Sequence, residues 1–168
     1  WVIDSDGGER RSGRMDLQRV TYVMGFGCGR SPLPPETPAG ILSGSWSDPS
    51  HAGEGNVLEI LIHNTALVKW FSLDAEGNRR WFFGTCQIQG DKLVFDVMLT
   101  TSGGVIGQGL EPNDVEVSPW GSLEMELACD TGSSSFLPTD DGFPAGELDL
   151  TRLTYLSGLS CGIMEQAR

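Results

Sequence analysis

The feature that most constrains the fold of this chain is a succession of short segments in which apolar and polar residues alternate, separated by glycine-rich turns. Residues 56–63 read NVLEILIH, so that Leu58, Ile60 and Ile62 share one face of an extended segment. Residues 121–129 (GSLEMELAC) alternate in the same way. Similar segments occur at residues 41–47, 66–73, 80–88, 92–100, 105–110, 115–117, 134–137 and 147–156. The pattern predicts eight or nine antiparallel strands joined as hairpins.

An all-β, antiparallel up-and-down barrel is the predicted architecture. The 168 residues suffice for one domain with its own core, and 23 glycines and 9 prolines supply the turns. No convincing amphipathic helix interrupts the series. Because an open sheet of this length would leave two unprotected edges, we expect it to close, with a β-sandwich as the alternative.

The chain contains a copy of its own C-terminal hairpin. Residues 15–29 (MDLQRVTYVMGFGCG), here named the copied segment, repeat residues 148–162 (LDLTRLTYLSGLSCG) with eight of fifteen positions identical. Residues 2–8 resemble residues 136–142 when one insertion is allowed. The sequence therefore divides into a hairpin copy (1–29), a proline-rich linker (30–40), a barrel module (41–162) and a tail (163–168).

Two accounts of this copy remain open. It is either the tail of a preceding repeat or a set of extra strands of the same barrel. In both cases two equivalent hairpins compete for one position, which is a physical route to strand exchange between molecules or between neighbouring repeats. We therefore expect the chain to associate with itself or with adjacent repeats.

Charge and cysteine content limit the compartment and the partners. The net charge of −12 disfavours nucleic acid, since the only dense basic stretch is residues 9–14. No apolar run is long enough for a membrane helix, and the first residue is Trp1, which indicates a processed protein or a piece of a longer one. Four cysteines without a CxxC pair, and only two histidines, favour disulfides over zinc and predict a secreted, periplasmic or cell-surface protein.

Catalytic and metal-binding patterns are sparse. Asp48, His51 and Glu54 recur at three-residue spacing in one loop and are candidates for a metal or acid–base site. The same residues suit a turn that hydrogen-bonds to its own backbone, which we favour. The chain shows no GxSxG motif and no glycine-rich phosphate loop before a helix, so we expect neither an enzyme nor a bound cofactor.

Tryptophans are the candidate ligand-binding residues. Trp70 and Trp81 flank one predicted hairpin and are expected to stack as cross-strand neighbours, and Trp120 lies near another turn. Consecutive strand residues point to opposite sides, so some aromatic residues near Trp70 and Trp81 must face away from the core. Such side chains can form a platform for a sugar ring, or they can be buried against the N-terminal hairpin or a neighbouring subunit.

Gly44, Trp46 and Arg152 resemble the signature of calycin barrels. In lipocalin- and avidin-like proteins a G-x-W tryptophan of the first strand is covered by a basic side chain of the last strand. The resemblance implies that the first and last strands are neighbours in a closed barrel, where a guanidinium stacks on an indole.

A second resemblance covers residues 42–161. The runs GSWSDPSHAGEGNVLEIL, VKWFSLDAEGNRRWFFG, PWGSLEMEL and LTRLT with its trailing cysteine are similar to a module found, sometimes in tandem, in secreted or envelope proteins of proteobacteria. No catalytic activity is known for it. In such modules a cysteine like Cys129 accompanies one like Cys161, which implies that pair and leaves Cys28 with Cys86.

Two functions are therefore expected. The first is a non-catalytic extracellular barrel with a structural or adhesive role, self-associating through the duplicated hairpin. The second is a module that binds carbohydrate through Trp70, Trp81 or Trp120, or a small ligand in the barrel mouth.

Overall fold

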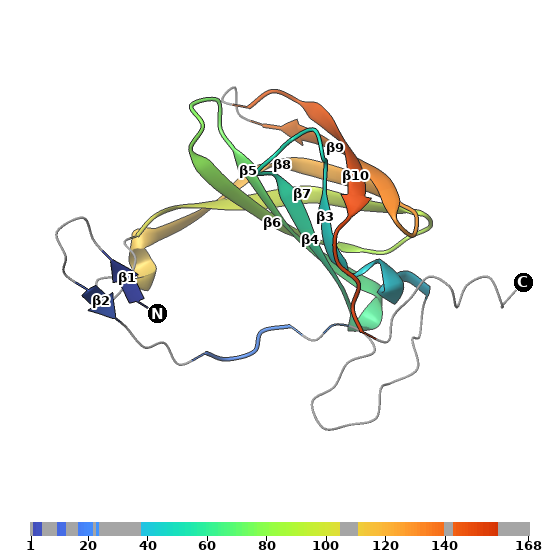
Figure 1. Ribbon diagram of the computed structural model, residues 1–168, viewed down its shortest axis with the longest axis horizontal. Coiled ribbons are helices and arrows are strands. Elements are labelled where there is room, and N and C mark those ends of the chain that lie inside the picture. The colour runs from blue at the N-terminus through green and yellow to red at the C-terminus, as the bar shows by residue number, and fades with distance from the viewer. Residues whose placement is uncertain are drawn as a thin grey trace, which may run out of the picture.

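The computed structural model describes residues 2–4, 10–12, 17–21, 23, 38–104, 111–139 and 143–157. Eight antiparallel strands form a closed barrel, and a separate two-stranded hairpin lies beside it (Figure 1). The barrel strands are β3 (Gly44–Ser47), β4 (Gly55–Leu61), β5 (Thr65–Leu73), β6 (Arg79–Gln87), β7 (Lys92–Gly103), β8 (Val115–Leu127), β9 (Thr131–Pro138) and β10 (Gly146–Arg152).

Each barrel strand pairs with its neighbours in the sequence, and the barrel closes where β10 pairs with β3. This up-and-down order confirms the predicted all-β barrel. Three short 3₁₀ helices occur in the connections: η1 (Pro38–Leu42), η2 (Ile62–Asn64) and η3 (Pro112–Asp114). Helix η1 replaces the start of the strand expected at residues 41–47, and the strand expected at residues 105–110 lies outside the described residues.

The predicted alternation holds along the strands and fills the barrel. In β4, Leu58 and Ile60 face inward, and in β8, Leu123 and Met125 do so, while the residues between them face outward. The buried apolar core consists of Trp46, Leu58, Ile60, Ala66, Val68, Trp70, Phe82, Leu93, Phe95, Met98, Trp120, Leu123, Met125, Leu148 and Leu150. These side chains come from every barrel strand except β9, and their burial is the main stabilising contribution.

Strand β8 runs unbroken where the sequence predicted two strands, at 115–117 and 121–129. Pro119, which lies between the two predicted strands, cannot donate a ladder hydrogen bond. In the structure Pro119 lies opposite Leu99, at an irregularity in the pairing of β7 with β8. A proline is tolerated at such a bulge because the ladder is already interrupted.

The N-terminal region forms its own hairpin, of β1 (Val2–Asp4) and β2 (Arg10–Ser12). Val2 pairs with Ser12, just as its counterpart Phe136 pairs with Gly146 in the hairpin β9–β10. These two strands form a two-stranded sheet that is separate from the barrel, as Figure 1 shows. The eight-stranded ring therefore closes without β1 and β2.

Candidate functional site

Gly44, Trp46 and Arg152 meet at the junction of β3 and β10, here named the closing seam. Thr151 pairs with Ser47 and Arg152 with Trp46, and Leu153 extends the contact by donating its N–H to the carbonyl of Ser45 at 2.8 Å. Gly44 has φ +152°, and a Cβ there would overlap the carbonyl oxygen of Thr154. Glycine is therefore needed for the two chains to approach at this seam.

Arg152 fastens the closing seam from inside. Its guanidinium donates to the carbonyl oxygens of Ser43 (2.8 Å), Cys129 (3.1 Å), Thr154 (3.0 Å) and Ile41. Burial lowers the pKa of Arg152 from its ordinary value, and four carbonyl dipoles face the charge. The side chain thus ties together η1, β3, the β8–β9 turn and the end of β10.

Arg152 also lies against aromatic rings. Its Cζ is 5.4 Å from the centroid of the Trp46 ring and 4.5 Å from that of Tyr155. Trp46 is itself held by a hydrogen bond from Nε1 to the carbonyl of Leu42 at 3.1 Å. The structure therefore brings the three residues of the calycin-like signature into one contact network, which fastens the barrel rather than exposing a reactive group.

The described part of the copied segment lies outside the barrel. Leu17 is 87% exposed, whereas its counterpart Leu150 on β10 is 2% exposed. Val20 is 90% exposed. The chain therefore presents to solvent a segment whose sequence matches that of a core strand, while β10 lies in the barrel between β9 and β3.

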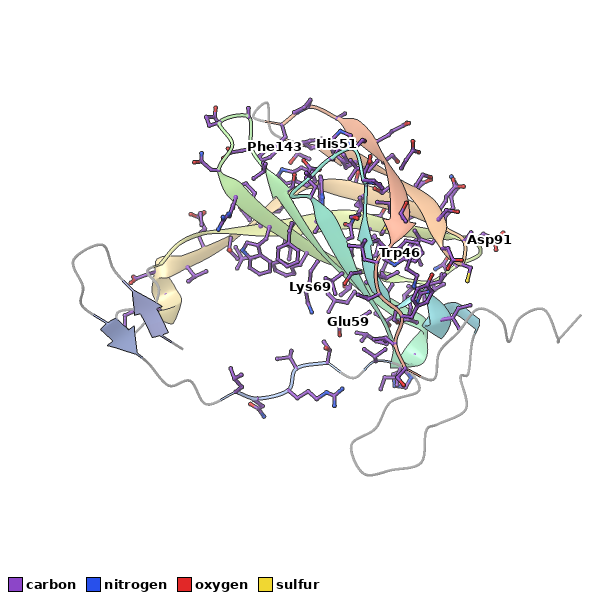
Figure 2. All side chains as sticks on the ribbon, viewed as in Figure 1. Trp46, His51, Glu59, Lys69, Asp91 and Phe143 are labelled. Carbon is purple, nitrogen blue, oxygen red and sulfur yellow. The ribbon has the colours of Figure 1, made fainter. Side chains whose placement is uncertain are left out.

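Two contacts hold the C-terminal end of the described part of this segment to the outer face of β4. Thr21 donates a hydrogen bond to the carboxylate of Glu59 at 2.6 Å, and Val23 forms an isolated antiparallel bridge with Leu61. Glu59 also forms an ion pair with Lys69 of β5 (Figure 2). Partial burial opposes ionisation of Glu59, yet the hydrogen bonds from Lys69 and Thr21 lower its pKa.

The three candidate tryptophans are divided between the two faces of the barrel wall. Trp70 and Trp120 are buried inside, with ring centroids 5.3 Å apart. Trp81 is 40% exposed on the outside. The expected stacking of Trp70 on Trp81 is therefore wrong: Trp70 pairs with Phe82, so Trp81 faces the opposite side.

On the outer wall Trp81 forms a patch with Phe71 and Phe83, here named the outer aromatic patch. Trp81 stacks on Phe83 with centroids 5.2 Å apart and an interplanar angle of 21°. Its Nε1 donates to the Thr101 hydroxyl at 3.0 Å, and Phe71 is its cross-strand neighbour. These contacts fix the orientation of an indole whose surface remains partly exposed.

Several polar groups inside the barrel have no hydrogen-bond partner among the residues that the structure describes. These are the side-chain amide of Asn56, the indole nitrogens of Trp70 and Trp120, and the hydroxyl of Ser134. Asn56 lies directly opposite Trp70 in the β4–β5 ladder. Because buried polar groups normally find partners, this interior suits ordered water or a small polar molecule.

The loop candidates Asp48, His51 and Glu54 are engaged in a turn. Asp48 accepts hydrogen bonds from the backbone (2.8 Å) and hydroxyl (2.6 Å) of Ser50, and from the Asp149 N–H of β10 at 3.2 Å. The hydrogen bonds from Ser50, supplemented by those from His51 and Asp149, lower the pKa of Asp48 well below its usual range. The turn thus anchors the β3–β4 loop to β10.

Ser50, His51 and Asp48 do not form a proton relay. The Ser50 hydroxyl and the Asp48 carboxylate both contact Nδ1 of His51, at 3.1 and 2.8 Å, whereas a relay needs one partner on each ring nitrogen. The Glu54 N–H bonds to the carbonyl of His51. Within the described ranges no group of three or more His, Cys, Asp and Glu residues is arranged to hold a metal ion.

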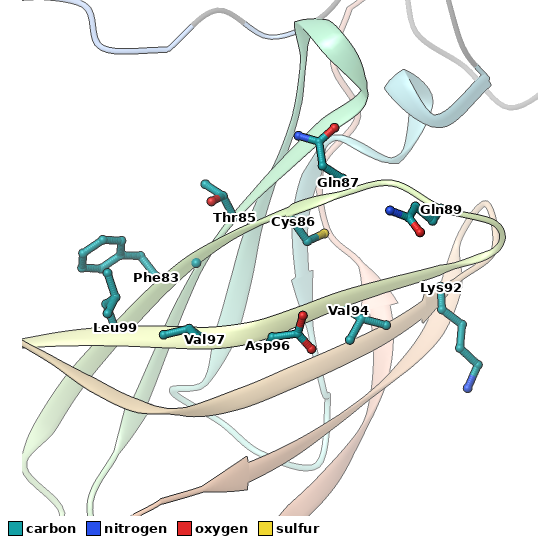
Figure 3. A pocket seen from close by; sticks show the side chains of 11 residues that line it. Phe83, Thr85, Cys86, Gln87, Gln89, Lys92, Val94, Asp96, Val97 and Leu99 are labelled. Carbon is teal, nitrogen blue, oxygen red and sulfur yellow. The ribbon is translucent and has the colours of Figure 1, made fainter.

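Cys86 borders an opening between β6 and β7. The two strands pair only at Phe82–Thr100 and Phe83–Leu99, and beyond these pairs they diverge (Figure 3). The opening has a volume of about 720 Å³, and Cys86, Asp96 and Val97 are among the residues that line it. Burial raises the pKa of the Cys86 thiol, which therefore stays protonated and is not an activated nucleophile.

The expected bond between Cys28 and Cys86 is not formed, because Cys86 is a free thiol. Its side chain packs toward the barrel core from the middle of β6, where its backbone pairs with Ala66. Cys28 and Cys161 lie outside the described residues. The Cys129–Cys161 pair therefore stays a prediction.

Sequence reasoning missed this opening. Its only trace in the sequence is a broken alternation in β7, where the inward residues Phe95 and Met98 are three positions apart instead of two. Such a step indicates a bulge. It does not reveal that the neighbouring strand diverges there.

Comparisons with other proteins give no relative. No known family profile, no curated protein and no solved structure matches the chain.

Within the part of the chain that the structure describes, no helix has the length and apolar character needed to cross a membrane.

Proposed function

We propose that this chain is a non-catalytic, extracellular β-barrel module with a structural or adhesive role, which joins to neighbouring units through the copied segment. The observation that carries the proposal is the contrast between Leu17, 87% exposed, and its buried counterpart Leu150. A segment built like a core strand, but left in solvent, favours association with another chain or repeat.

The proposal of a non-catalytic role rests on how the candidate reactive groups are used. Asp48 and His51 serve a turn, and burial keeps the thiol of Cys86 protonated. Arg152 is engaged by backbone carbonyls at the closing seam. Each of these groups has a structural task.

Sedimentation velocity over a range of concentrations tests the association. We expect the intact chain to form dimers or larger species as its concentration rises, and Leu17→Asp to weaken this association by roughly tenfold or more, since burying a leucine contributes about 1.5–3 kcal/mol. Leu137→Asp is the matched control, because Leu137 is also exposed but lies on β9. A monomer at every concentration, or equal effects of both variants, would refute the proposal.

A second candidate function, carbohydrate binding, is favoured by the outer aromatic patch. Trp81 is oriented by Phe83 and Thr101 and keeps an exposed ring surface, which is what stacking on a sugar requires. Titration with soluble β-glucan and chitin oligosaccharides, followed by tryptophan fluorescence, would test it. Binding should be lost in Trp81→Ala and kept in Leu137→Ala; no response to either sugar class rejects this candidate.

The interior polar groups without a partner among the described residues support a small polar ligand in the barrel mouth less strongly than the outer aromatic patch supports carbohydrate binding. Trp70 and Trp120 are packed against Phe82 at ring-centroid distances of 5.1 and 4.1 Å. These close contacts leave ordered water as the simpler partner for the Asn56 amide and the indole nitrogens.

A further inference from the structure

The position between β3 and β9 that β10 occupies is here named the closing slot. We infer that the copied segment is a second closing strand for this slot, so that a barrel of this type can be closed either by its own β10 or by the copied segment of a neighbouring unit. The inference rests on the proposed function and names the surface to which the copied segment binds.

The first argument is that the copied segment carries the residues through which β10 contacts the slot. Leu150 fills the core, Arg152 binds the carbonyls of the closing seam, and the Thr154 hydroxyl accepts a hydrogen bond from the Ser45 N–H at 2.8 Å. Their counterparts in the copy are Leu17, Arg19 and Thr21. These three groups are therefore identical in the two strands, and the other inward residue of β10, Leu148, is replaced by Met15, an apolar residue of similar volume.

The differences at Thr151 and Leu153 fall on residues that face away from the core. Thr151, replaced by Gln18 in the copy, is exposed, and Leu153, replaced by Val20, is 61% exposed. Neither change alters the volume placed inside the barrel. The slot therefore distinguishes the two strands only weakly by their contacts.

The second argument is that the closing seam has a short ladder. β10 pairs with β3 through two residue pairs, against six pairs with β9. The side chain of Arg152 supplies much of the remaining attachment, and Arg19 provides the same side chain in the copy. A strand with this sequence can therefore close the ring without a long ladder of backbone hydrogen bonds to β3.

Since each chain has one slot and two closing strands, occupancy depends on how each strand is tethered. β10 is tethered to β9 by a hairpin loop at residues 139–145, which gives it a high effective concentration. The copied segment takes the slot when β10 is weakened, or when a neighbouring barrel lacks its own closing strand.

A double-mutant cycle in the full chain tests this exchange. Leu17 and Leu150 do not share a structural environment in the described state, since one is in solvent and the other is in the core. If the slot accepts only β10, the two substitutions are additive and Leu17→Asp has no effect on barrel stability in either background. If the copy replaces a weakened β10, the two positions become coupled.

The variants are Leu17→Asp, Leu150→Ala and the double variant, with urea unfolding followed by tryptophan fluorescence. We expect Leu17→Asp alone to leave the unfolding midpoint unchanged. In the Leu150→Ala background we expect it to raise the unfolding equilibrium constant roughly tenfold or more, because a leucine that had entered the core is lost. Leu150→Ala is preferred to a charged substitution because alanine leaves a cavity in the core but buries no unpaired charge, so we expect the variant to fold. Additivity would overturn the inference.

This experiment separates the inference from the proposed function. Association that depends on Leu17 without coupling to Leu150 would leave the joining role intact and reject the closing slot as its binding surface. Coupling in a chain that is monomeric at all concentrations would place the exchange within one molecule and reject the joining role. Leu137→Asp in the Leu150→Ala background is the control, and we expect it to be additive.

Discussion

Replacing Arg152 by alanine is the strongest single perturbation of barrel closure that the structure offers. The substitution removes the donors that reach the carbonyl oxygens of Ile41, Ser43, Cys129 and Thr154, and also the cation over the Trp46 ring. Hydrogen bonds to charged groups contribute about 1.5–3 kcal/mol each, but water entering the opened seam restores part of this.

We therefore expect Arg152→Ala to lower the free energy of unfolding by about 3–5 kcal/mol, a large share of the 5–15 kcal/mol typical of a domain. Arg152→Lys should recover only part of this loss, since an ammonium presents a point charge in place of a planar fork. Chemical unfolding in urea, read by tryptophan fluorescence, measures both. Arg79→Ala, at an exposed position of β6, should stay within about 0.5 kcal/mol of the parent.

A loss below about 1 kcal/mol for Arg152→Ala would refute the reasoning. It would show that the four carbonyl groups are satisfied by other means, and that the ladder between β3 and β10 closes the barrel without the side chain. Equal losses for the Ala and Lys variants would have a narrower meaning: the fork geometry, rather than the charge, would then account for the contribution.

Three further predictions concern Asp48, Cys86 and Gly44. Because the pKa of Asp48 is lowered in the fold, its ionisation stabilises the fold above the unfolded-state pKa of about 4, and this contribution is lost as the pH falls. A plot of unfolding free energy against pH from 6 to 2 should therefore be flatter for Asp48→Asn than for the parent. Parallel curves would contradict this. The half-buried thiol of Cys86, whose pKa is raised by burial, should react with a maleimide roughly tenfold more slowly at pH 7.5 than in urea, and equal rates would show that neither burial nor a raised pKa protects the thiol in the folded chain. Gly44→Ala should lower the free energy of unfolding in urea by about 1–3 kcal/mol, because the added Cβ meets the Thr154 carbonyl. This loss should be larger than that of Gly53→Ala, where the added Cβ has no atom within 4 Å. The reverse order would contradict the tight approach at the closing seam.

The strand pattern was predictable because residue alternation reports directly on burial. The inward positions of β4 and β8 follow from sequence spacing alone, and so does the hairpin order. Closure of the sheet was expected because an open sheet would leave two unprotected edges. The calycin-like resemblance anticipated that Arg152 would lie near Trp46, as it does.

Register was the main property that the sequence left open. In the β5–β6 hairpin the turn at Asp74 is closed by hydrogen bonds with Asn78 and Gly77, which sets Leu73 opposite Arg79. Only this register decides that Trp70 faces inward and Trp81 outward, since a shift of one residue reverses the facing of every side chain. The expected stacking of these two tryptophans failed for that reason.

The opening between β6 and β7, and with it the free thiol of Cys86, depends on a non-local divergence of two strands. No local pattern encodes such a divergence. Pairing of cysteines by elimination failed there because elimination takes no account of which way a side chain faces, and Cys86 packs toward the barrel core.

The most direct test of the central claim, that the copied segment joins one unit to the next, is to find what it touches. A benzophenone amino acid at position 20, photoactivated in an equal mixture of ¹⁵N-labelled and unlabelled chains, reports by mass spectrometry whether its contacts lie within or between molecules. We predict cross-links between labelled and unlabelled chains that map to β3 and the β8–β9 turn, the surroundings of Leu153. Cross-links confined to single chains, on β4 near Glu59 where Thr21 lies, would contradict the account.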